Sequence, residues 1–400
     1  MTSLTRKLLL DYYLGGTLQA ALKPLVVLLG RLLHRNHRLE DCREITFLKL
    51  LGGGSLVIAY PALLALRQSG RFKRLRLVAT EKTAPFGQVL GVFDEILIVG
   101  DEDLPRLLGD SLHVLRTLSR TDAVVDLEIH SRLSTVFCLL TRAKNRIGAY
   151  TEDSFWRRDL ATHLLFYNKF GSIFGLYDQI AGLFNAPVPP FAQCIETFRA
   201  TLAKTGKPKP QAAPQDVAIA PCCSDLSRER MLREEDWPTV LERFFTGHPA
   251  PPPAVHLIGG KGDREFLETF TTLVHRASPT STVVNHAGLL SLQESVALVG
   301  SVGRLLCVDS AMLHFARLQG VPTVSYWGPT NPATYLRPSA DANDEVHYTR
   351  IGCSPCVHLA NVAPCKGHNV CMKFAVDPQC GLNPNPTWLA QDPLARKEPE

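Results

Sequence analysis

The fold is decided by the stretch Leu305-Leu306-Cys307-Val308-Asp309-Ser310-Ala311-Met312-Leu313-His314-Phe315-Ala316. An apolar run that ends in Asp-Ser predicts a strand over 304–308 and a helix over 311–318, because Asp and Ser favour the position before a helix. At the carboxyl end of a parallel strand, such a helix offers free N–H groups and its dipole to a phosphate. We therefore expect the backbone of Ser310, Ala311 and Met312 to bind a phosphate, although a plain helix cap explains the same pair.

Short apolar strands and longer helical patterns alternate on both sides of this stretch, which is typical of βα units around a parallel sheet. The expected strands are 45–51, 74–80, 95–99, 123–129, 146–149, 217–221, 254–258, 282–284, 304–308 and 323–327. The expected helices are 56–68, 133–141, 237–245, 263–275, 291–299 and 311–318. We expect further helices in the aromatic-rich residues 151–195, beside a cleft. The pattern predicts an α/β protein in which two Rossmann-like domains face a cleft.

A charged, proline-rich run without apolar periodicity, residues 204–215, predicts a linker between the domains. The first domain then covers 45–203 and the second covers 216–345. A basic amphipathic segment, 1–44, precedes them, and a Cys-rich segment, 346–400, follows them.

Composition restricts the class of protein and its compartment. With 400 residues and 45% hydrophobic residues, the chain is neither disordered nor fibrous. The 43 basic and 38 acidic residues give a net charge of +5, which is too small to indicate a nucleic-acid partner. Eleven cysteines in a long chain without a cleavable signal pattern indicate a reducing compartment, and we expect the cytoplasm.

The first 44 residues combine leucine-rich runs with basic side chains. Asp11, Lys23 and Pro24 interrupt these runs, so no uncharged stretch reaches the roughly 20 residues of a membrane span. One interpretation is an interfacial helix on an anionic leaflet, with Tyr12 and Tyr13 at headgroup depth. The other is a basic helix packed on its own domain. The first interpretation predicts a peripheral protein of the inner membrane.

Several segments, in the correct order, resemble the family 9 glycosyltransferases, the bacterial lipopolysaccharide heptosyltransferases. Leu292-Gln293-Glu294-Ser295, the stretch 305–316 and Gly328-Pro329-Thr330 resemble the donor-site signature of that family. Gly54-Ser55-Leu56-Val57, Val125-Asp126-Leu127 and Cys353-Ser354-Pro355-Cys356 resemble its first loop, a later strand and its C-terminal cysteines. The similarity extends from about Ile45 to Cys371.

The resemblance implies a GT-B fold and inverting, metal-independent transfer that requires no cofactor. The donor is a nucleotide-diphosphate sugar, ADP-heptose in characterised members, and the acceptor is a lipid-linked glycan such as lipopolysaccharide. The resemblance also implies that a basic residue seven positions before Trp237 binds the donor, and Arg230 stands there. The expected donor-binding residues are Arg230, Ser224, Lys261, Asp309, Ser310, Ala311, Met312 and His314.

The general base is the point where the sequence departs from the family. Ser55 stands where the family has its proposed base, an Asp, and an unassisted hydroxyl is a poor base at neutral pH. Glu128 and His130, at the end of the expected strand 123–129, are the alternative candidates, with a strand-end salt bridge and a helix cap as their structural interpretations. We expect Gly52, Gly53 and Gly54 to let the acceptor or the donor phosphate approach the backbone.

The C-terminal cysteines have a spacing that is compatible with a metal site. Cys353, Cys356, Cys365 and Cys371 begin with a C-x2-C pair, and four thiolates can hold a structural zinc ion. His358 and His368 lie nearby in the sequence. A reversible disulfide and plain buried thiols remain open alternatives.

These observations predict an inverting glycosyltransferase at the cytoplasmic face of the membrane. Because of Ser55, two alternatives remain: a nucleotide-sugar epimerase or hydrolase on the same fold, and an inactive relative that binds the sugar nucleotide.

Overall fold

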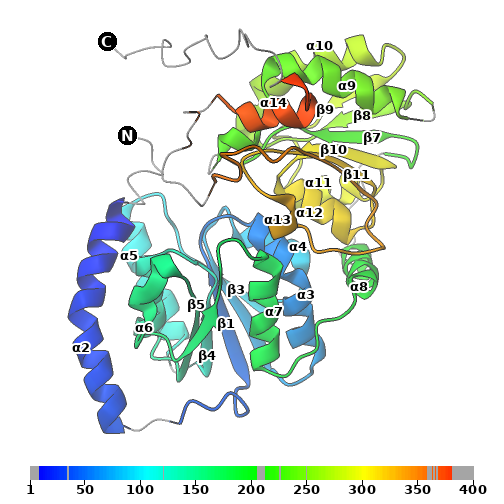
Figure 1. The fold of residues 1–400 in the computed structure, drawn as a ribbon. Coiled ribbons are helices and arrows are strands. Elements are labelled where there is room, and N and C mark those ends of the chain that lie inside the picture. The colour runs from blue at the N-terminus through cyan, green and yellow to red at the C-terminus, as the bar shows by residue number, and fades with distance from the viewer. Residues whose placement is uncertain are drawn as a thin grey trace. The chain divides into compact units, whose positions relative to one another are not determined.

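The protein is described by a computed structural model that covers residues 9–33, 36–119, 121–204, 212–224, 227–248, 250–357, 363, 365 and 368–380. It consists of two compact units, Met1–Cys194 and Ile195–Glu400 (Figure 1). The division lies within α8 (Phe191–Lys204), and most of the linker expected at 204–215 falls outside the described residues. His358, one of the histidines considered beside the cysteines, also falls outside them.

Unit 1 is built on a six-stranded parallel sheet with the order β3-β2-β1-β4-β5-β6. Its strands are β1 (Glu44–Lys49), β2 (Arg74–Ala79), β3 (Glu95–Ile98), β4 (Ala123–Asp126), β5 (Asn145–Tyr150) and β6 (His163–Phe166). The helices are α3 (Gly54–Gln68), α4 (Ala84–Leu90), α5 (Leu104–Thr117), α6 (Arg132–Leu140), α7 (Ile173–Leu183) and the short η2 (Glu152–Arg157). Helices α3, α4 and α7 cover one face of the sheet, and α5 and α6 cover the other (Figure 1).

Unit 2 repeats this plan with the parallel order β12-β11-β10-β7-β8-β9. Its strands are β7 (Val217–Ala220), β8 (Ala254–Leu257), β9 (Thr282–Asn285), β10 (Arg304–Val308), β11 (Thr323–Trp327) and β12 (Asp344–Tyr348). The helices are α9 (Trp237–Thr246), α10 (Arg264–Ala277), α11 (Leu292–Val299), α12 (Ala311–Leu318), α13 (Pro332–Tyr335) and α14 (Val370–Val376), with the short turns η3 (Arg228–Arg230), η4 (Glu234–Asp236) and η5 (Lys261–Asp263). The expected α/β class with two Rossmann-like sheets is confirmed.

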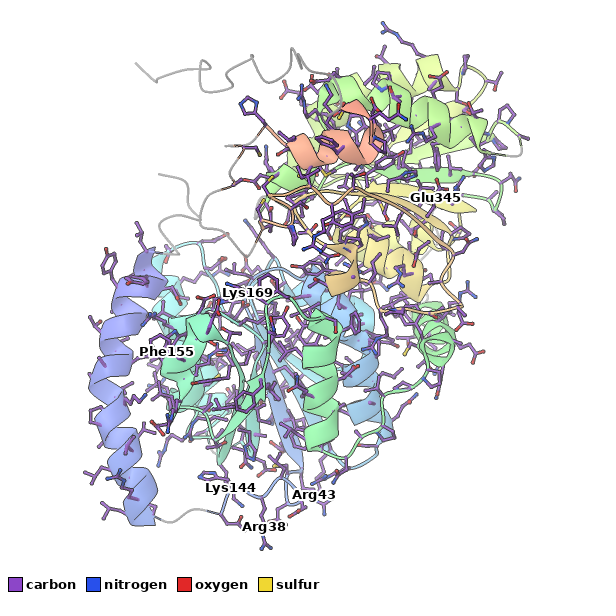
Figure 2. All side chains as sticks on the ribbon, viewed as in Figure 1. Arg38, Arg43, Lys144, Phe155, Lys169 and Glu345 are labelled. Carbon is purple, nitrogen blue, oxygen red and sulfur yellow. The ribbon has the colours of Figure 1, made fainter. Side chains whose placement is uncertain are left out.

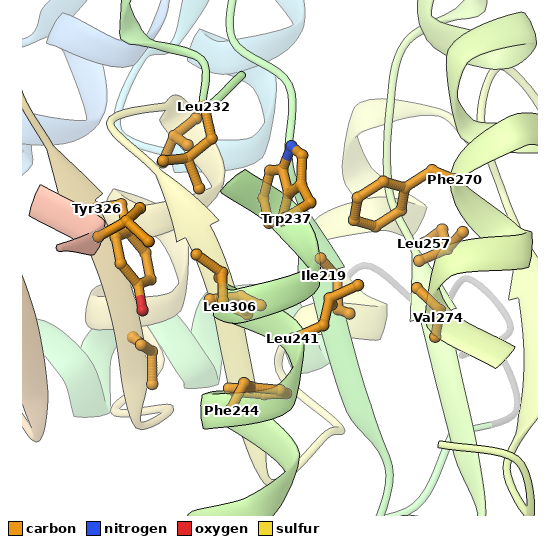
Figure 3. Close-up of a cluster of buried hydrophobic side chains, with 14 of the residues drawn as sticks. Ile219, Leu232, Trp237, Leu241, Phe244, Leu257, Phe270, Val274, Leu306 and Tyr326 are labelled. Atoms are coloured by element: carbon orange, nitrogen blue, oxygen red, sulfur yellow. The ribbon is translucent and has the colours of Figure 1, made fainter. Parts of the chain in front are cut away.

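Strand alternation in unit 2 produces one hydrophobic core on each face of the sheet. Val217 and Ile219 of β7 pack against α9 and α10, whereas Ala218 and Ala220 face α11 and α12. In the first core, the buried Trp237 ring meets Phe270 edge-on at 4.9 Å (Figure 3). Both faces are covered, so the loops at the strand ends are the parts of the sheet left to bind a ligand.

The structure corrects several sequence-based expectations about elements. Strand β4 ends at Asp126, so the alternation argument that placed Glu128 and His130 on one face of a strand to Ile129 does not apply. The region 151–195 contains strand β6 as well as helices. Helices α4 and α5 and strand β12 were not predicted.

The apolar helix of the N-terminal segment is α2 (Gly16–Leu33), preceded by the π-helical turn η1 (Asp11–Gly15). The carboxylate of Asp11 accepts hydrogen bonds from the Ser131 hydroxyl (2.6 Å) and from the backbone N–H groups of Arg132 (3.0 Å) and Leu133 (2.9 Å). Asp11 therefore caps α6, which compensates for the positive end of that helix dipole. Gln19 also donates to the Arg132 carbonyl. The predicted packing of this helix on its own domain is correct.

Much of the helical stretch 9–33 remains exposed and apolar. Its exposed large side chains are Leu9, Leu10, Tyr12, Tyr13 and Leu14 before α2, and Leu18, Leu25, Leu28, Leu29, Leu32 and Leu33 within α2. By length and composition, the helical stretch Asp11–Leu33 is able to cross a membrane, although Lys23 had suggested otherwise. A signal sequence or a soluble helix passes the same test, so this finding is weak evidence for a span.

Candidate functional site

In unit 2, two loops meet where the strand order reverses, between the carboxyl ends of β7 and β10. Ligands of open α/β sheets bind at this switch point. The loop after β7 leads to η3, which carries Arg230, and the loop after β10 carries Asp309 and Ser310. Ser310 has an extended backbone and starts α12, as the sequence predicted. Its buried hydroxyl has no hydrogen-bond partner among the residues that the structure describes, so it is able to bind a polar ligand at the head of this helix.

Arg230 joins the two loops. Its Nη1 donates to the Asp309 carbonyl (3.0 Å) and lies 3.6 Å from the Asp309 carboxylate, whereas its Nη2 donates to the Ser224 hydroxyl (3.0 Å). A third bond runs from Nε to the Ser227 carbonyl (3.2 Å). The structure thus brings together Arg230, Ser224 and Asp309, three residues that the sequence placed in the donor site. A guanidinium carries five N–H donors, which leaves capacity for a phosphate.

The buried Asp309 carboxylate orients this cation. It accepts a hydrogen bond from Thr330 (2.7 Å), and burial raises its pKa while Arg230 and Thr330 oppose that rise. Burial together with Arg317 and Arg230 lowers the pKa of His314 to about 3, so this imidazole is neutral at physiological pH. His314 is therefore a neutral, buried member of the site and supplies no charge to a phosphate.

The other predicted donor residues lie around the same edge of the sheet. Lys261 is exposed at the start of η5, after β8. The thiol of Cys223 contacts the Ser227 carbonyl (3.1 Å), and burial raises the pKa of both Cys222 and Cys223. These thiols remain protonated and line the loop after β7.

In unit 1, the switch point lies between β1 and β4. The predicted glycine loop follows β1, and two glycines there have a structural reason. Gly52 has a positive φ of 71°, and a side chain at Gly53 would collide with the Phe86 ring. The Ser55 hydroxyl donates to the Gly52 carbonyl (2.7 Å) and forms a hydrogen bond with the buried Tyr177. No acid stands beside Ser55 among these contacts.

The Glu128 carboxylate is fully engaged by its own domain. One oxygen accepts the backbone N–H groups of Leu50 (2.7 Å) and Leu51 (2.8 Å), and the other accepts Lys49 Nζ (3.1 Å). Both oxygens of Glu128 are therefore already hydrogen-bonded within unit 1. They also occupy amides at the entrance of the glycine loop that a phosphate would otherwise use.

The surroundings of the His130 side chain differ from those of Glu128. The His130 side chain is exposed, and partial desolvation by neighbouring atoms lowers its pKa, which Asp153 opposes and Arg157 reinforces. The imidazole is neutral at physiological pH and can accept a proton.

A buried ion pair supports this edge of unit 1. Arg157 Nη2 donates to Asp126 (2.9 Å), its Nη1 donates to the Ala149 carbonyl (3.0 Å), and its Nε donates to Thr135 (3.0 Å). The Arg157 side chain is 1% exposed. It therefore fixes η2 against the ends of β4 and β5.

The C-terminal cysteines brace the loop after β11. None of the eleven cysteines forms a disulfide in the structure. The N–H groups of Cys356 and Val357 donate to the Pro329 carbonyl, and Cys371 lies against Gly328. Burial and the nearby Cys356, Cys365 and Cys353 raise the pKa of Cys371 to about 12. Within the described ranges, no three His, Cys, Asp or Glu side chains are grouped as metal ligands.

Comparison with known proteins identifies the family. The model of glycosyltransferase family 9 (heptosyltransferase) matches residues 114–366. The chain belongs to this family. No curated protein matches the chain in sequence. Three solved structures share the fold of glycosyltransferase family 9, at identities too low to transfer a substrate.

The first is a family 9 glycosyltransferase from Veillonella parvula DSM 2008, with 17% identity and a TM-score of 0.57 over 78% of this chain and 87% of that chain. E. coli ADP-heptose lipopolysaccharide heptosyltransferase II has 15% identity and a TM-score of 0.57 over 83% and 98% of the two chains. E. coli heptosyltransferase WaaC with ADP has 13% identity and a TM-score of 0.59 over 76% and 93%. The suspected glycosyltransferase family and its fold are confirmed.

Sequence reasoning missed Lys49, Tyr177, Arg157 and the role of Thr330 in the family 9 site. The role of Thr330 could have been predicted from the sequence, because its hydroxyl belongs to the Gly328-Pro329-Thr330 motif. No sequence pattern marks Lys49 or Arg157, because such charged residues acquire their roles only through contacts with distant segments.

Proposed function

We propose that this glycosyltransferase transfers a heptose, with inversion, from a nucleotide-diphosphate donor to a lipopolysaccharide-like acceptor. The observation that most supports this proposal is the hydrogen bond from Arg230 to the Asp309 carbonyl at the head of α12. It lies beside the Ser310 hydroxyl, which has no hydrogen-bond partner among the described residues. A cation and a helix N-terminus favour an anionic diphosphate. The structures of E. coli heptosyltransferase WaaC with ADP and with ADP-2-deoxy-2-fluoro heptose support this donor class.

In the proposed reaction, the acceptor hydroxyl oxygen forms a bond to the anomeric carbon while the bond from that carbon to the donor phosphate breaks. His130 takes the hydroxyl proton, since its neutral imidazole is exposed whereas the oxygens of Glu128 accept N–H groups. The leaving diphosphate carries the electron pair, and Arg230 and the amides of α12 stabilise its charge. We therefore propose that transfer requires no divalent cation and no organic cofactor.

The donor is tested by calorimetry with ADP, UDP and GDP on the full chain, followed by product analysis with the matching sugar nucleotide. We expect one nucleotide diphosphate to bind and sugar to be transferred only when acceptor is present, with undiminished rate in EDTA. Sugar release or epimerisation without acceptor would instead support the hydrolase or epimerase alternative. Binding without any turnover would support the inactive relative.

The acceptor is proposed to be a lipid-linked glycan at the cytoplasmic face of the inner membrane, with η1 and α2 as a peripheral anchor. The exposed leucines of α2 support this proposal, because exposed apolar surface of this extent marks an interaction site. Arg31, Arg38 and Arg43 are exposed at and beyond the C-terminal end of α2 and would attract an anionic leaflet. Eleven unpaired cysteines are compatible with a reducing compartment.

Anchoring is tested by flotation with phosphatidylglycerol vesicles. Replacing Leu25, Leu28 and Leu32 together by Ser should release the protein, whereas Leu289→Ser, which removes an equally exposed leucine of unit 2, should not. Deletion of the segment is a poorer test, since it also removes the Asp11 cap of α6. Resistance of the wild type to carbonate extraction would indicate a span, and unaltered flotation of the triple variant would contradict the anchor.

We also propose a structural zinc ion at Cys353, Cys356, Cys365 and Cys371. The C-x2-C spacing of Cys353 and Cys356 supports it, although the described residues hold no three such side chains grouped as metal ligands. Elemental analysis of the purified protein should find one zinc per chain, lost in Cys356→Ser. Absence of metal with four titratable thiols would leave plain buried thiols as the explanation.

A further inference from the structure

Unit 1 has an open hollow of about 420 Å³ that the donor chemistry does not use. Its walls are the rings of Tyr150, Phe155, Phe166 and Tyr167, at the ends of β5 and β6 and in η2. The volume lies within the roughly 300–1,000 Å³ range of small-molecule sites. We call this feature the aromatic hollow.

Two rings of the aromatic hollow lie unusually open to solvent. Phe155 is 65% exposed and Phe166 is 68% exposed, and Figure 2 labels Phe155 at the surface of unit 1. The Phe166 ring meets Tyr150 edge-on, with centroids 5.5 Å apart. Exposing phenylalanine faces costs hydration free energy, so a ligand that covers them would be stabilised.

Polar groups surround these rings. Glu152, Thr151 and Asn168 complete the lining, and Glu152 forms an ion pair with Lys169 from the loop after β6. Hydrogen bonds hold the walls in place, because Arg157 of η2 donates to the Asp126 carboxylate and to the Ala149 carbonyl near the end of β5. The site is therefore preorganised, with apolar faces at its centre and hydrogen-bonding groups at its rim.

The position of the aromatic hollow connects it with both the candidate base and the anchor. Asp153, two residues before Phe155, interacts electrostatically with His130. On the other side, the Arg132 guanidinium lies 5.1 Å from the Tyr12 ring and 5.3 Å from the Trp156 ring. The aromatic hollow therefore lies beside His130 and beside the N-terminal end of the exposed apolar helix.

The shape of the aromatic hollow favours a sugar over a hydrocarbon. A hydrocarbon chain gains little where most of its surface stays in water, as it would in an open hollow. A pyranose has an apolar C–H face that stacks on an aromatic ring and a rim of hydroxyl groups that bind carboxylate and amide groups. Both requirements are met by Phe155 and Phe166 and by Glu152 and Asn168.

We propose that the aromatic hollow binds a saccharide ring of the acceptor, stacked on Phe155 and Phe166 and hydrogen-bonded at its rim. This inference rests on the proposed function, whose acceptor it specifies. It predicts that the acceptor is recognised through its glycan, next to the anchor that brings the protein to the membrane.

Saturation-transfer NMR on the full chain tests the proposal, with lipid-free oligosaccharide from rough-type lipopolysaccharide as the probe. We expect saturation of the sugar C–H protons, and a loss of affinity of about threefold to tenfold in Phe155→Leu and in Phe166→Leu. Phe155→Tyr should retain the affinity because it keeps the ring. Leu108→Ala, which truncates a 61% exposed side chain on α5, is the matched control and should behave as wild type.

Three results would overturn the assignment. These are no saturation of the oligosaccharide by the wild type, unchanged affinity in both leucine variants, and displacement of the oligosaccharide by decanoate below its micellar concentration. The last result would show a hydrocarbon site instead. Calorimetry with nucleotide diphosphates on the same samples separates the donor proposal from the saccharide proposal. Failure to bind a nucleotide would contradict the proposed function, whereas the NMR result for the oligosaccharide would still test the aromatic hollow.

Discussion

The two switch points of this protein have the same topology, and each holds one ion pair, Arg230 with Asp309 in unit 2 and Lys49 with Glu128 in unit 1. They differ in the sign of the side chain that joins the two loops. In unit 2, the cation Arg230 comes from the loop after the first strand and donates to the carbonyl of Asp309, after the fourth. In unit 1, the anion Glu128 comes from the loop after the fourth strand and accepts the N–H groups of Leu50 and Leu51, after the first.

This difference explains how one fold can support two tasks. In unit 1, the carboxylate of Glu128 fills the place that an anionic ligand would need, so this edge suits a neutral acceptor. In unit 2, the buried Ser310 hydroxyl lacks a partner and a cation stands beside it, so this edge suits a phosphate. Each of the following variants tests this difference between the switch points of unit 1 and unit 2.

The largest effect is expected for Arg230→Met. Loss of a charge-stabilising donor at the leaving group should reduce kcat/KM by about 100- to 1,000-fold. Calorimetry should show weaker nucleotide diphosphate binding. Arg264→Ala, which removes an exposed arginine paired with Glu268, is the control and should change neither quantity. Full nucleotide affinity in Arg230→Met would remove the distinction between the two switch points.

A second large effect is expected for His130→Asn. Loss of the general base should lower kcat by about 100-fold while the nucleotide affinity stays unchanged. Because the pKa of His130 lies below its ordinary value of 6.5, the wild-type rate should be level at neutral pH and fall as the pH drops through that lowered pKa. A variant with wild-type kcat, or with the same acid limb, would contradict this role.

Glu128→Gln is expected to act on stability more than on catalysis. Gln keeps the shape of the side chain, but its NH2 group replaces one acceptor oxygen and faces either the backbone N–H groups or Lys49 Nζ. The free energy of unfolding should therefore fall by about 2 kcal/mol. Urea denaturation of the full chain measures this change. A strong loss of kcat at unchanged stability would instead make Glu128 the base.

The smallest effect is expected for Thr330→Val, which leaves the Asp309 carboxylate without its hydroxyl donor. We expect a loss of about 1 kcal/mol in unfolding free energy and a modest loss of nucleotide affinity. Thr330→Ser should restore both, as it keeps the hydroxyl. Wild-type affinity in Thr330→Val would show that Arg230 alone orients Asp309.

The sequence predicted more of unit 2 than of unit 1. Strands 304–308 and 323–327 and helix 311–318 agree with the structure residue for residue, because alternation and capping are local signals. In unit 1, the expected strand to Ile129 ends at Asp126. The Asp126 carboxylate accepts the backbone N–H of Glu128 (3.0 Å), a local turn at the end of the strand, and its other oxygen accepts a hydrogen bond from Arg157, 31 positions away.

By itself, the sequence determined the α/β class, most of the strands and the helix start at Ser310, since each of these shows in a pattern of about a dozen neighbouring residues. Only the tertiary structure decided that Asp11 caps α6, that Glu128 is occupied by Leu50 and Leu51, and that Phe155 and Phe166 form one hollow. These contacts join segments that are distant in the chain. Their energies depend on burial and direction, which arise only after the sheets have formed.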